Sequence, residues 1–421
     1  MKYNRENLKK AFNATLEGMS VYKAAKVCSV PESTLRDRTL GIVPIDVSIG
    51  FTPIFNREEE EKLVAHIKYM ADVGYGYNKR GAREYAASLG KDLTQQKSNS
   101  STLSNCWFYG FLHRWPDLKV ASPQKLTTCR AEAASRHKLN SYYKELSSIM
   151  TRHNIRQSPE QIYNIDETGI STEHNQPKII CSKSTKPQAI TSARSSLTTT
   201  IAAGNAIGNH LPPFYVFKGK RWSDDLLKGS VPGAEGIMTE TGWSNTQVFE
   251  KYLTEFFAKH TGISDSRNQR SVLVLYDWHK SHVSLTLTDW AKRHNVILFV
   301  LPPHTSHLTQ HLDVAIFGLL KSMYNKECQM FLQRNPGTSI TKHLVAELTA
   351  KPYLRALSPE NLTSAFKKTG IYPFNNKVIS NSEVAPSIIY EHNQDKDDTD
   401  NNKDQTSTKS KKSGKENIEI D

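Results

Sequence analysis

The residues Val272-Leu273-Val274-Leu275-Tyr276-Asp277 form a run of apolar side chains that ends in an acid. A run this short and this apolar is typical of a β-strand that is covered on both faces. A second run, Val296-Ile297-Leu298-Phe299-Val300-Leu301, follows it and ends at Pro302-Pro303-His304. Upstream, residues 162–169 are typical of a short strand that ends in acids and a turn. Together these runs predict a mixed α/β domain over residues 159–376.

Three carboxylates accompany these strands. Asp166 and Asp277 each follow a strand, and Asp313 opens an apparent helix. Carboxylates at the ends of central strands, with another on a nearby helix, can converge on a hard divalent cation. A pair of such cations can activate a water and stabilise the leaving oxygen of a phosphodiester. The three aspartates are therefore candidate ligands of Mg²⁺ or Mn²⁺, although a single aspartate at a strand end is more often a cap or turn residue.

Residues 1–45 are punctuated as three short helices, which predicts a first all-α helix-turn-helix module. Gly18 ends the first helix, Ser20 caps the second, and Pro31 stands where the third begins. A short final helix that carries Arg and Ser or Thr is how a recognition helix enters a major groove. The alternative is a generic three-helix bundle with solvated arginines. The candidate DNA contacts are Ser33, Thr34, Arg36 and Arg38.

Residues 50–120 predict a second all-α helix-turn-helix module. Its acidic first turn, Glu58–Glu61, suits the positive end of a helix dipole. Further helices are expected over Lys79–Leu89 and Leu103–Trp115. On the last helix we expect Trp107, Phe111 and Leu112 in the core, whereas His113 and Arg114 are candidate contacts to DNA phosphates.

Composition and charge favour a polyanionic partner. The net charge is +13, and residues 1–150 carry 23 Lys and Arg against 15 Asp and Glu. No apolar run reaches the roughly 20 residues of a membrane span, and no apolar segment follows the N-terminus, so neither a membrane nor secretion is expected. The five cysteines are scattered without a C-x-x-C pair, which argues against a disulfide framework and a zinc finger. Residues 121–158 are typical of a linker with a helix, and residues 377–421 of a disordered charged tail.

Many segments, in order from Met1 to about Ile379, resemble the pogo/Tigger/jerky branch of the mariner-type transposases. The first module, with Met19–Ala25 and Val30–Arg38, is similar to the pipsqueak-type helix-turn-helix, and residues 51–118 are similar to the centromere-protein-B-type module. The similar segments of the α/β region are Asn164–Gly169, Pro212-Pro213, Phe217–Arg221, Glu240–Trp243, Leu301–His307 and Thr369–Phe374.

This resemblance implies a ribonuclease-H-like fold whose three metal-binding aspartates map to Asp166, Asp277 and Asp313. It implies a nuclear DNA transposase or endonuclease. The two modules would bind terminal inverted repeats in double-stranded DNA, and the aspartates would cut strands and join the freed 3′-hydroxyl to target DNA, usually at a TA step. Similar enzymes act as dimers or higher assemblies. Lys218, Lys220 and Arg221 are further candidate DNA contacts, and the tail segment Lys409–Lys415 is a candidate nuclear-import signal.

Two residues depart from the family pattern. Trp278 follows the second aspartate, where a small residue or Asn is usual, and His311 replaces a proline before the third aspartate. Both favour an alternative function, a host-recruited chromatin or transcription factor that binds specific DNA and leaves its catalytic fold unused. Glu167 is a candidate base beside the first aspartate. A third hypothesis, a zinc hydrolase, leaves the helix-turn-helix pair unexplained; its ligands would come from His279, His282, His304, His307 and His311.

Overall fold

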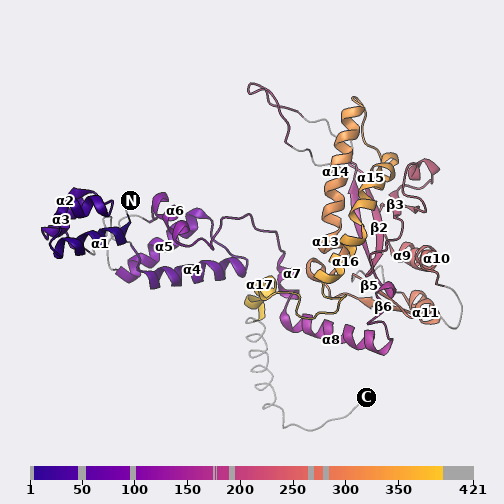
Figure 1. Cartoon of the computed structure of the whole chain (residues 1–421). Helices are drawn as coiled ribbons and strands as arrows, with labels where there is room; N and C mark the ends of the chain where they lie inside the picture. Colours follow the sequence, from indigo (N-terminus) through magenta and orange to yellow (C-terminus); the bar gives the residue numbers. More distant parts are fainter. Residues whose placement is uncertain are drawn as a thin grey trace, which may run out of the picture. The chain divides into compact units, whose positions relative to one another are not determined.

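The computed structural model describes residues 4–45, 54–94, 101–173, 176, 178–188, 195–263, 270–277 and 284–391. The chain divides into two compact units (Figure 1). One comprises Met1–Ala65 and Arg80–Tyr109, and the other comprises His66–Lys79 and Gly110–Asp421. Among the described residues, no helix combines the length and the apolar character that crossing a membrane requires.

The first module consists of the predicted three helices, α1 (Arg5–Leu16), α2 (Val21–Val27) and α3 (Glu32–Thr39). The Ser20 hydroxyl caps α2 by accepting a hydrogen bond from the Lys23 amide at 3.4 Å. Two alanines on α2 let the helices approach closely, which makes a small core sufficient. The residues of this core are Leu8, Ala11, Ala24, Ala25, Val30 and Leu35.

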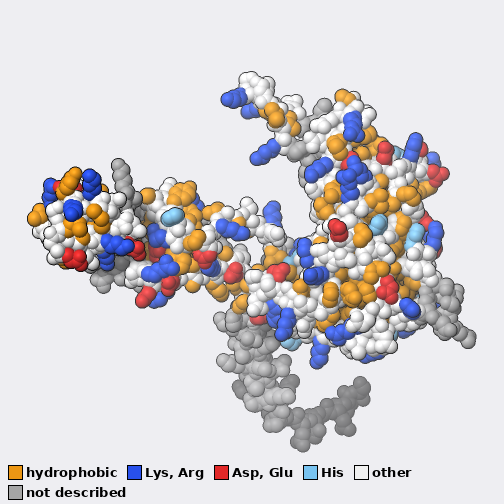
Figure 2. All heavy atoms as spheres, viewed as in Figure 1, with side chains coloured by type: hydrophobic (Ala, Val, Ile, Leu, Met, Phe, Trp, Pro, Cys, Tyr) orange, Lys and Arg blue, Asp and Glu red, His pale blue; other side chains and the backbone are white. Residues whose placement is uncertain are grey.

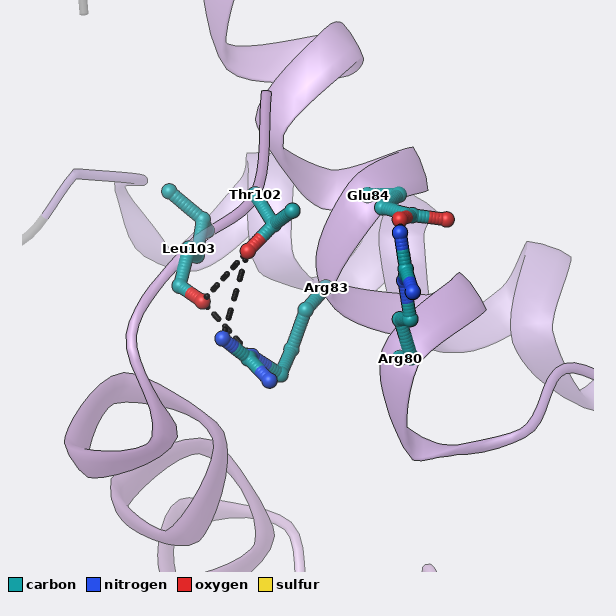
Figure 3. Close-up of polar contacts among 5 residues, drawn as sticks. All are labelled: Arg80, Arg83, Glu84, Thr102 and Leu103. Carbon is teal, nitrogen blue, oxygen red and sulfur yellow. Dashed lines mark hydrogen bonds and ion pairs between the residues drawn. The ribbon is translucent and has the colours of Figure 1, made fainter. Parts of the chain in front are cut away.

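The second helical region contains α4 (Arg57–Asp72), α5 (Lys79–Thr94) and α6 (Asn105–Arg114). The guanidinium of Arg83 on α5 donates to the Leu103 carbonyl at 2.6 Å and to the Thr102 hydroxyl at 3.2 Å (Figure 3). Arg83 thereby anchors the segment that leads into α6, whereas the neighbouring Arg80 pairs with Glu84 on its own helix. These two arginines on adjacent turns therefore have different structural roles.

The core side of α6 differs from the prediction. Phe108 and Phe111 are buried, whereas Trp107 and Leu112 keep part of their surface exposed. Trp107 instead packs edge-on against Phe55, with ring centroids 6.1 Å apart. The buried pair is three positions apart, which places both rings on one helical face.

A six-stranded mixed sheet forms the centre of the larger unit, in the order β4-β3-β2-β1-β5-β6. β1 pairs with β2 and β2 with β3 in antiparallel fashion, whereas β1–β5, β5–β6 and β3–β4 are parallel. Helices cover both faces, as the ribonuclease-H-like prediction requires (Figure 1). The strands are β1 (Ile162–Ser171), β2 (Leu197–Asn205), β3 (Phe214–Lys218), β4 (Glu235–Thr239), β5 (Val272–Tyr276) and β6 (Val296–Val300).

The two faces of the sheet have separate cores. On one face Ile165 and Val274 pack with aromatic residues of the α9–η3–α10 helix, in which η3 is a π-helical segment. On the other face Ile162, Leu275 and Ala202 pack with α8 and α13–α16.

The helices of the larger unit have the following bounds: α7 (Thr128–Ala133), α8 (Arg136–Arg152), α9 (Thr246–Lys251), η3 (Tyr252–Phe257), α10 (Ala258–Thr261), α11 (Leu285–Arg293), α12 (Ser306–Thr309), α13 (His311–Ala315), α14 (Phe317–Arg334), α15 (Lys342–Ala356) and α16 (Pro359–Lys368). The short elements are η1 (Pro159–Gln161), η2 (Asp224–Leu227), α17 (Asn381–Val384) and η5 (Ala385–Ser387).

Two predicted segments contribute to the core of the larger unit. Residues 121–158 contain the expected helix, α8, which buries Tyr143 and four other side chains there. The tail does not begin at 377, because Ile379 and Val384 are buried in the same core and Arg136 donates to the Ile379 carbonyl at 2.9 Å. Residues 377–391 carry more apolar side chains than the sequence after them, and those side chains hold this stretch against the core. Residues 392–421 lie outside the described residues.

His311 lies in the packing between α13 and α16. Its ring is fully buried against Phe366, with centroids 4.4 Å apart, and neither ring nitrogen has a hydrogen-bond partner among the described residues. Burial lowers the pKa of His311 to about 3. The ring is therefore neutral at physiological pH and fills the space beside Phe366.

We expect His311→Leu to reduce the acid sensitivity of the fold. Between pH 6.5 and about 3 the unfolded chain binds a proton at His311 that the folded chain does not, so acidification costs up to about 1.4 kcal/mol per pH unit. Urea unfolding should show the variant gaining stability over the wild type as the pH falls from 7 to 5. A wild-type-to-variant difference that stays constant with pH would contradict the assignment.

Candidate active site and DNA-facing helices

The parallel pairing of β1 and β5 brings two of the predicted aspartates together. Ile165 is in register with Tyr276, so Asp166 and Asp277 are the next residues on adjacent strands. Asp166 shares the sheet face of Asn164, and Asp277 shares the face of Leu275, because side chains alternate along a strand. One detail differs from the prediction: β1 continues to Ser171, so Asp166 lies within the strand and pairs there with Ala202 of β2.

The third aspartate approaches from α13, which packs on β1. The pKa of Asp166 is raised well above its usual value, first by burial and then by the negative charges of Asp313 and Asp277. The pKa of Asp313, which keeps exposed surface, is raised by partial loss of hydration and by Asp277. A carboxylate that raises the pKa of a neighbouring carboxyl group lies close enough to repel its charged form. The structure thus brings the three residues into one aspartate site (Asp166, Asp277 and Asp313).

Some of the carboxylate oxygens of this site accept hydrogen bonds. Asp166 Oδ1 accepts from the Glu167 amide at 2.8 Å, whereas Asp166 Oδ2 is buried and has no partner among the described residues. Asp277 Oδ2 accepts from the Ser306 hydroxyl at 2.7 Å. Sequence reasoning gave Ser306 no role. Its position shortly after β6, the strand that neighbours β5, could have indicated that Ser306 lies near Asp277.

The donor set fits a hard divalent cation, although it is not a preformed cage. Within the described ranges, no group of three or more His, Cys, Asp or Glu side chains has an arrangement ready to hold a metal. Carboxylate oxygens are the ligands that Mg²⁺ and Mn²⁺ prefer, and the buried Asp166 Oδ2 has no hydrogen-bond partner among the described residues. Asp166, Asp277 and Asp313 are therefore the residues that would hold such an ion.

Two basic residues that the sequence analysis did not single out lie near the aspartate site. Lys321 of α14 and Arg130 of α7 both lower the pKa of Asp313, against the larger effects that raise it. Both side chains are exposed. They supply positive charge beside a carboxylate cluster, where an anionic substrate would otherwise be repelled.

The histidines of the zinc hypothesis do not gather in the described part of the chain. His311 is buried against Phe366, and the half-buried His307 has a pKa lowered first by burial and then by Arg130. His304 takes a left-handed backbone conformation, with φ of 61°. Trp278, His279 and His282 lie outside the described residues.

Glu167 is on the opposite sheet face from Asp166, as the alternation along β1 requires. Its charge contributes to the raised pKa of Tyr252, a residue of the other core. Glu167 contacts the aspartate site through its backbone amide, which donates to Asp166. This placement does not favour the candidate role as a base beside the metal ligands.

The DNA-facing residues predicted on α3 fall into two groups. Ser33 and Arg36 are exposed, and Thr34 is half-buried. Arg38, however, is 5% exposed, and its guanidinium donates to the Pro44 carbonyl. Arg38 lies three positions from the core residue Leu35 and so shares its helical face, which corrects the prediction that it faces DNA. On the face seen in Figure 2, Lys and Arg side chains lie among apolar ones over α1–α3.

On α6, both predicted phosphate contacts are exposed. His113 shares its helical face with Tyr109, which is 60% exposed, and with Asn105. Sequence reasoning gave Tyr109 no role. His113 and Arg114 remain predicted contacts to DNA.

Lys218, Lys220 and Arg221 are exposed at the end of β3, away from the aspartates. Val216 is in register with Thr199, and Thr199 with Gly169, so Lys218 lies several residues beyond Asp166 along the sheet. Lys220 forms an exposed ion pair with Glu240 at 3.1 Å. A cavity of about 550 Å³ borders this turn, lined in part by Lys220, Asn245 and Lys251, and none of the three aspartates lines it.

Two family models match the chain. Residues 194–366 match the DDE superfamily endonuclease, and residues 4–43 match the helix-turn-helix Psq domain. The architecture is thus that of a DDE transposase-like DNA-binding protein. The two matches stand in the predicted order, a pipsqueak-type helix-turn-helix ahead of a DDE-type endonuclease domain.

Individual proteins show more distant similarity. The chain is 27% identical over 224 residues to the MFS-type transporter clz9 of Cochliobolus lunatus, a match that covers 52% of this chain and 24% of that protein. The Mos1 strand transfer complex aligns with a TM-score of 0.45 at 11% identity, covering 91% of this chain and 98% of that one. The Mos1 paired-end complex with left transposon end gives 0.40 at 11% identity, covering 87% and 98%.

We expect Asp166→Asn to stabilise the metal-free protein at neutral and alkaline pH. The raised pKa means that ionisation of Asp166 costs the folded state more than the unfolded chain, so its destabilising effect grows as the pH rises through the folded-state pKa. In EDTA the variant should melt above the wild type, by about 2–4 °C per kcal/mol, and the gain should vanish near pH 4.

Added Mg²⁺ should raise the melting temperature of the wild type and not that of Asp166→Asn. Asp289→Asn, which removes an exposed carboxylate of α11, is the matched control and should behave as the wild type. Equal melting temperatures for wild type and Asp166→Asn in EDTA at every pH would rule out the repulsion.

Proposed function

We propose that this protein is a metal-dependent DNA transposase or endonuclease that binds the terminal repeats of a DNA element and cleaves and joins strands there. The observation that carries the proposal is the convergence of Asp166, Asp277 and Asp313 from two adjacent strands and a helix. The match to the DDE superfamily endonuclease supports it. Mg²⁺ or Mn²⁺ is the proposed cofactor.

The chain's own residues account for substrate orientation. A divalent cation held by the three carboxylates would polarise the scissile phosphate and lower the pKa of the attacking water or 3′-hydroxyl. Ser306 holds one oxygen of Asp277 in place. Arg130 and Lys321, as exposed cations near Asp313, would bind phosphates on either side of the reacting one. No side chain need form a covalent intermediate.

The N-terminal helices supply recognition in this proposal. The match to the Psq domain supports DNA binding by α1–α3, with Ser33 and Arg36 on the exposed side of α3. Two linked weak modules gain apparent affinity through effective concentration, which suits a bipartite terminal repeat. We further propose a TA target step, assembly as a homo-oligomer on paired ends, and a nuclear location.

We expect the purified protein to nick DNA that carries its own terminal repeats when Mg²⁺ or Mn²⁺ is present. Asp277→Asn should abolish nicking and leave DNA binding intact, because the carboxylate is lost and the shape is kept. Asp289→Asn should nick as the wild type does. Gel assays of nicking and of binding on the same preparations check both statements.

The second candidate function is a recruited DNA-binding factor. The absence of a preformed three-ligand metal group within the described residues favours it. Tight, sequence-specific binding by the wild type without nicking in either metal would establish this function in place of the first.

Arg36→Ala should weaken specific DNA binding by about 1–3 kcal/mol if Arg36 reads a base. In the absence of DNA, Arg36 pairs with Glu32 on its own helix. This exposed ion pair can be replaced by a contact to DNA at small cost. Lys10→Ala, which removes an exposed charge from α1, is the control. The affinities of the variant for specific and for unrelated duplexes test this role. An equal loss of affinity for both would indicate that Arg36 contacts phosphates instead of a base.

A further inference from the structure

Two buried amides, Asn164 of β1 and Gln310 at the start of α13, meet beneath the aspartate site. Both side chains are 0% exposed. They are 146 residues apart in the chain, and the Asn164 Nδ2 group donates to Gln310 Oε1. We call these two residues the amide pair. The metal-ligand assignment does not involve either of them.

Each further hydrogen bond of the amide pair ends within two residues of an aspartate of the site. Asn164 Nδ2 donates to the Leu275 carbonyl at 2.9 Å, two residues before Asp277. Gln310 Nε2 donates to the Ile165 carbonyl at 3.2 Å, one residue before Asp166.

The third bond involves α13 itself. The Leu312 amide donates to Asn164 Oδ1 at 3.2 Å, one residue before Asp313. The amide pair therefore touches the backbone beside all three carboxylates.

Core stability alone does not account for this arrangement. The backbones of β1 and β5 are already paired at this level, with Asn164 in register with Leu275, so the strands do not need the amide to associate. The pair also bonds to the Ile165 and Leu275 carbonyls and the Leu312 amide, which apolar replacements would leave without these partners. Amide groups differ from apolar groups in that their hydrogen bonds are directional.

The element whose position and rotation these hydrogen bonds fix is α13. It has five residues, His311–Ala315, far fewer than a helix needs to be stable on its own. Its packing contacts, such as that of His311 with Phe366, are apolar and tolerate rotation. Three directional hydrogen bonds fix the position and the rotation of the helix that carries Asp313: Asn164 donates to Gln310, Gln310 donates to the Ile165 carbonyl of β1, and the Leu312 amide of α13 donates to Asn164.

We propose that Asn164 and Gln310 are positioning residues that set the spacing of Asp313 from Asp166 and Asp277, and thereby the affinity of the site for a divalent cation. This inference rests on the proposed function in one respect, namely that the three aspartates bind a metal. It does not require that the protein cleave DNA.

The test compares metal affinity in full-length variants. Gln310→Met keeps the side-chain length and removes the amide, and Asn164→Leu/Gln310→Met replaces both partners by apolar groups of similar shape. Mn²⁺ binding followed by electron paramagnetic resonance should weaken about ten- to a hundredfold in each, as is typical when the residues that orient metal ligands are changed. Circular dichroism and thermal melting establish that each variant is folded, and the double variant serves if the single one is not.

Thr309→Val is the matched control. Thr309 is also 0% exposed and adjacent to Gln310, but its hydroxyl bonds only within its own segment, to Thr305. This variant should bind Mn²⁺ as the wild type does.

The outcomes separate the two proposals. Folded Gln310→Met and double variants with wild-type Mn²⁺ affinity would overturn the positioning role, whatever the nicking assay shows. Mn²⁺ binding by the wild type that the variants weaken, with no nicking by any of them, would support the positioning role and overturn the enzymatic function. A wild type that binds Mn²⁺ no better than Asp166→Asn would overturn both.

Discussion

Mutual repulsion among three carboxylates is the constraint around which the larger unit is built. After burial, the charges of Asp313 and Asp277 raise the pKa of Asp166, and the charge of Asp277 raises that of Asp313, so the three are held near one another against an electrostatic cost. The parallel pairing of β1 with β5 meets much of this requirement, because Ile165 and Tyr276 in register leave the next residues side by side. That pairing is secured in turn by cores on both faces of the sheet, which bury every side chain of β5.

The third carboxylate is held in a different way. A strand is located by a ladder of backbone hydrogen bonds, whereas the short helix that carries Asp313 has no ladder to a neighbour. Its place is set by a few side chains, and the buried amides of Asn164 and Gln310 are the directional ones among them. Directional contacts between buried groups cost desolvation and return little net stability, so their presence here indicates a demand for geometry.

In the first helical module, two arginines of α3 have different roles, one in the core and one on the surface. Arg36 and Arg38 are two positions apart on α3, which places them on different helical faces. Arg38 is turned inward to the Pro44 carbonyl and closes the end of a core built largely from small residues. Arg36 is left outward, where the Psq-domain match and the exposed side of α3 support contact with DNA. Identical side chains thus serve stability and recognition within one turn of helix.

Local signals in the sequence determined the elements and the reactive residues. Apolar runs predicted β5 and β6, Ser20 marked the start of α2, and strand ends pointed to Asp166 and Asp277, because each of these depends on neighbours a few positions away. Only the tertiary structure decided that β1 continues past Asp166, that Arg38 is buried, and that Ile379 and Val384 join the core. It alone brought Gln310 to Asn164 and Ser306 to Asp277. The physical reason is that burial and hydrogen-bond partners are set by chain segments far apart in sequence, and no local pattern records them.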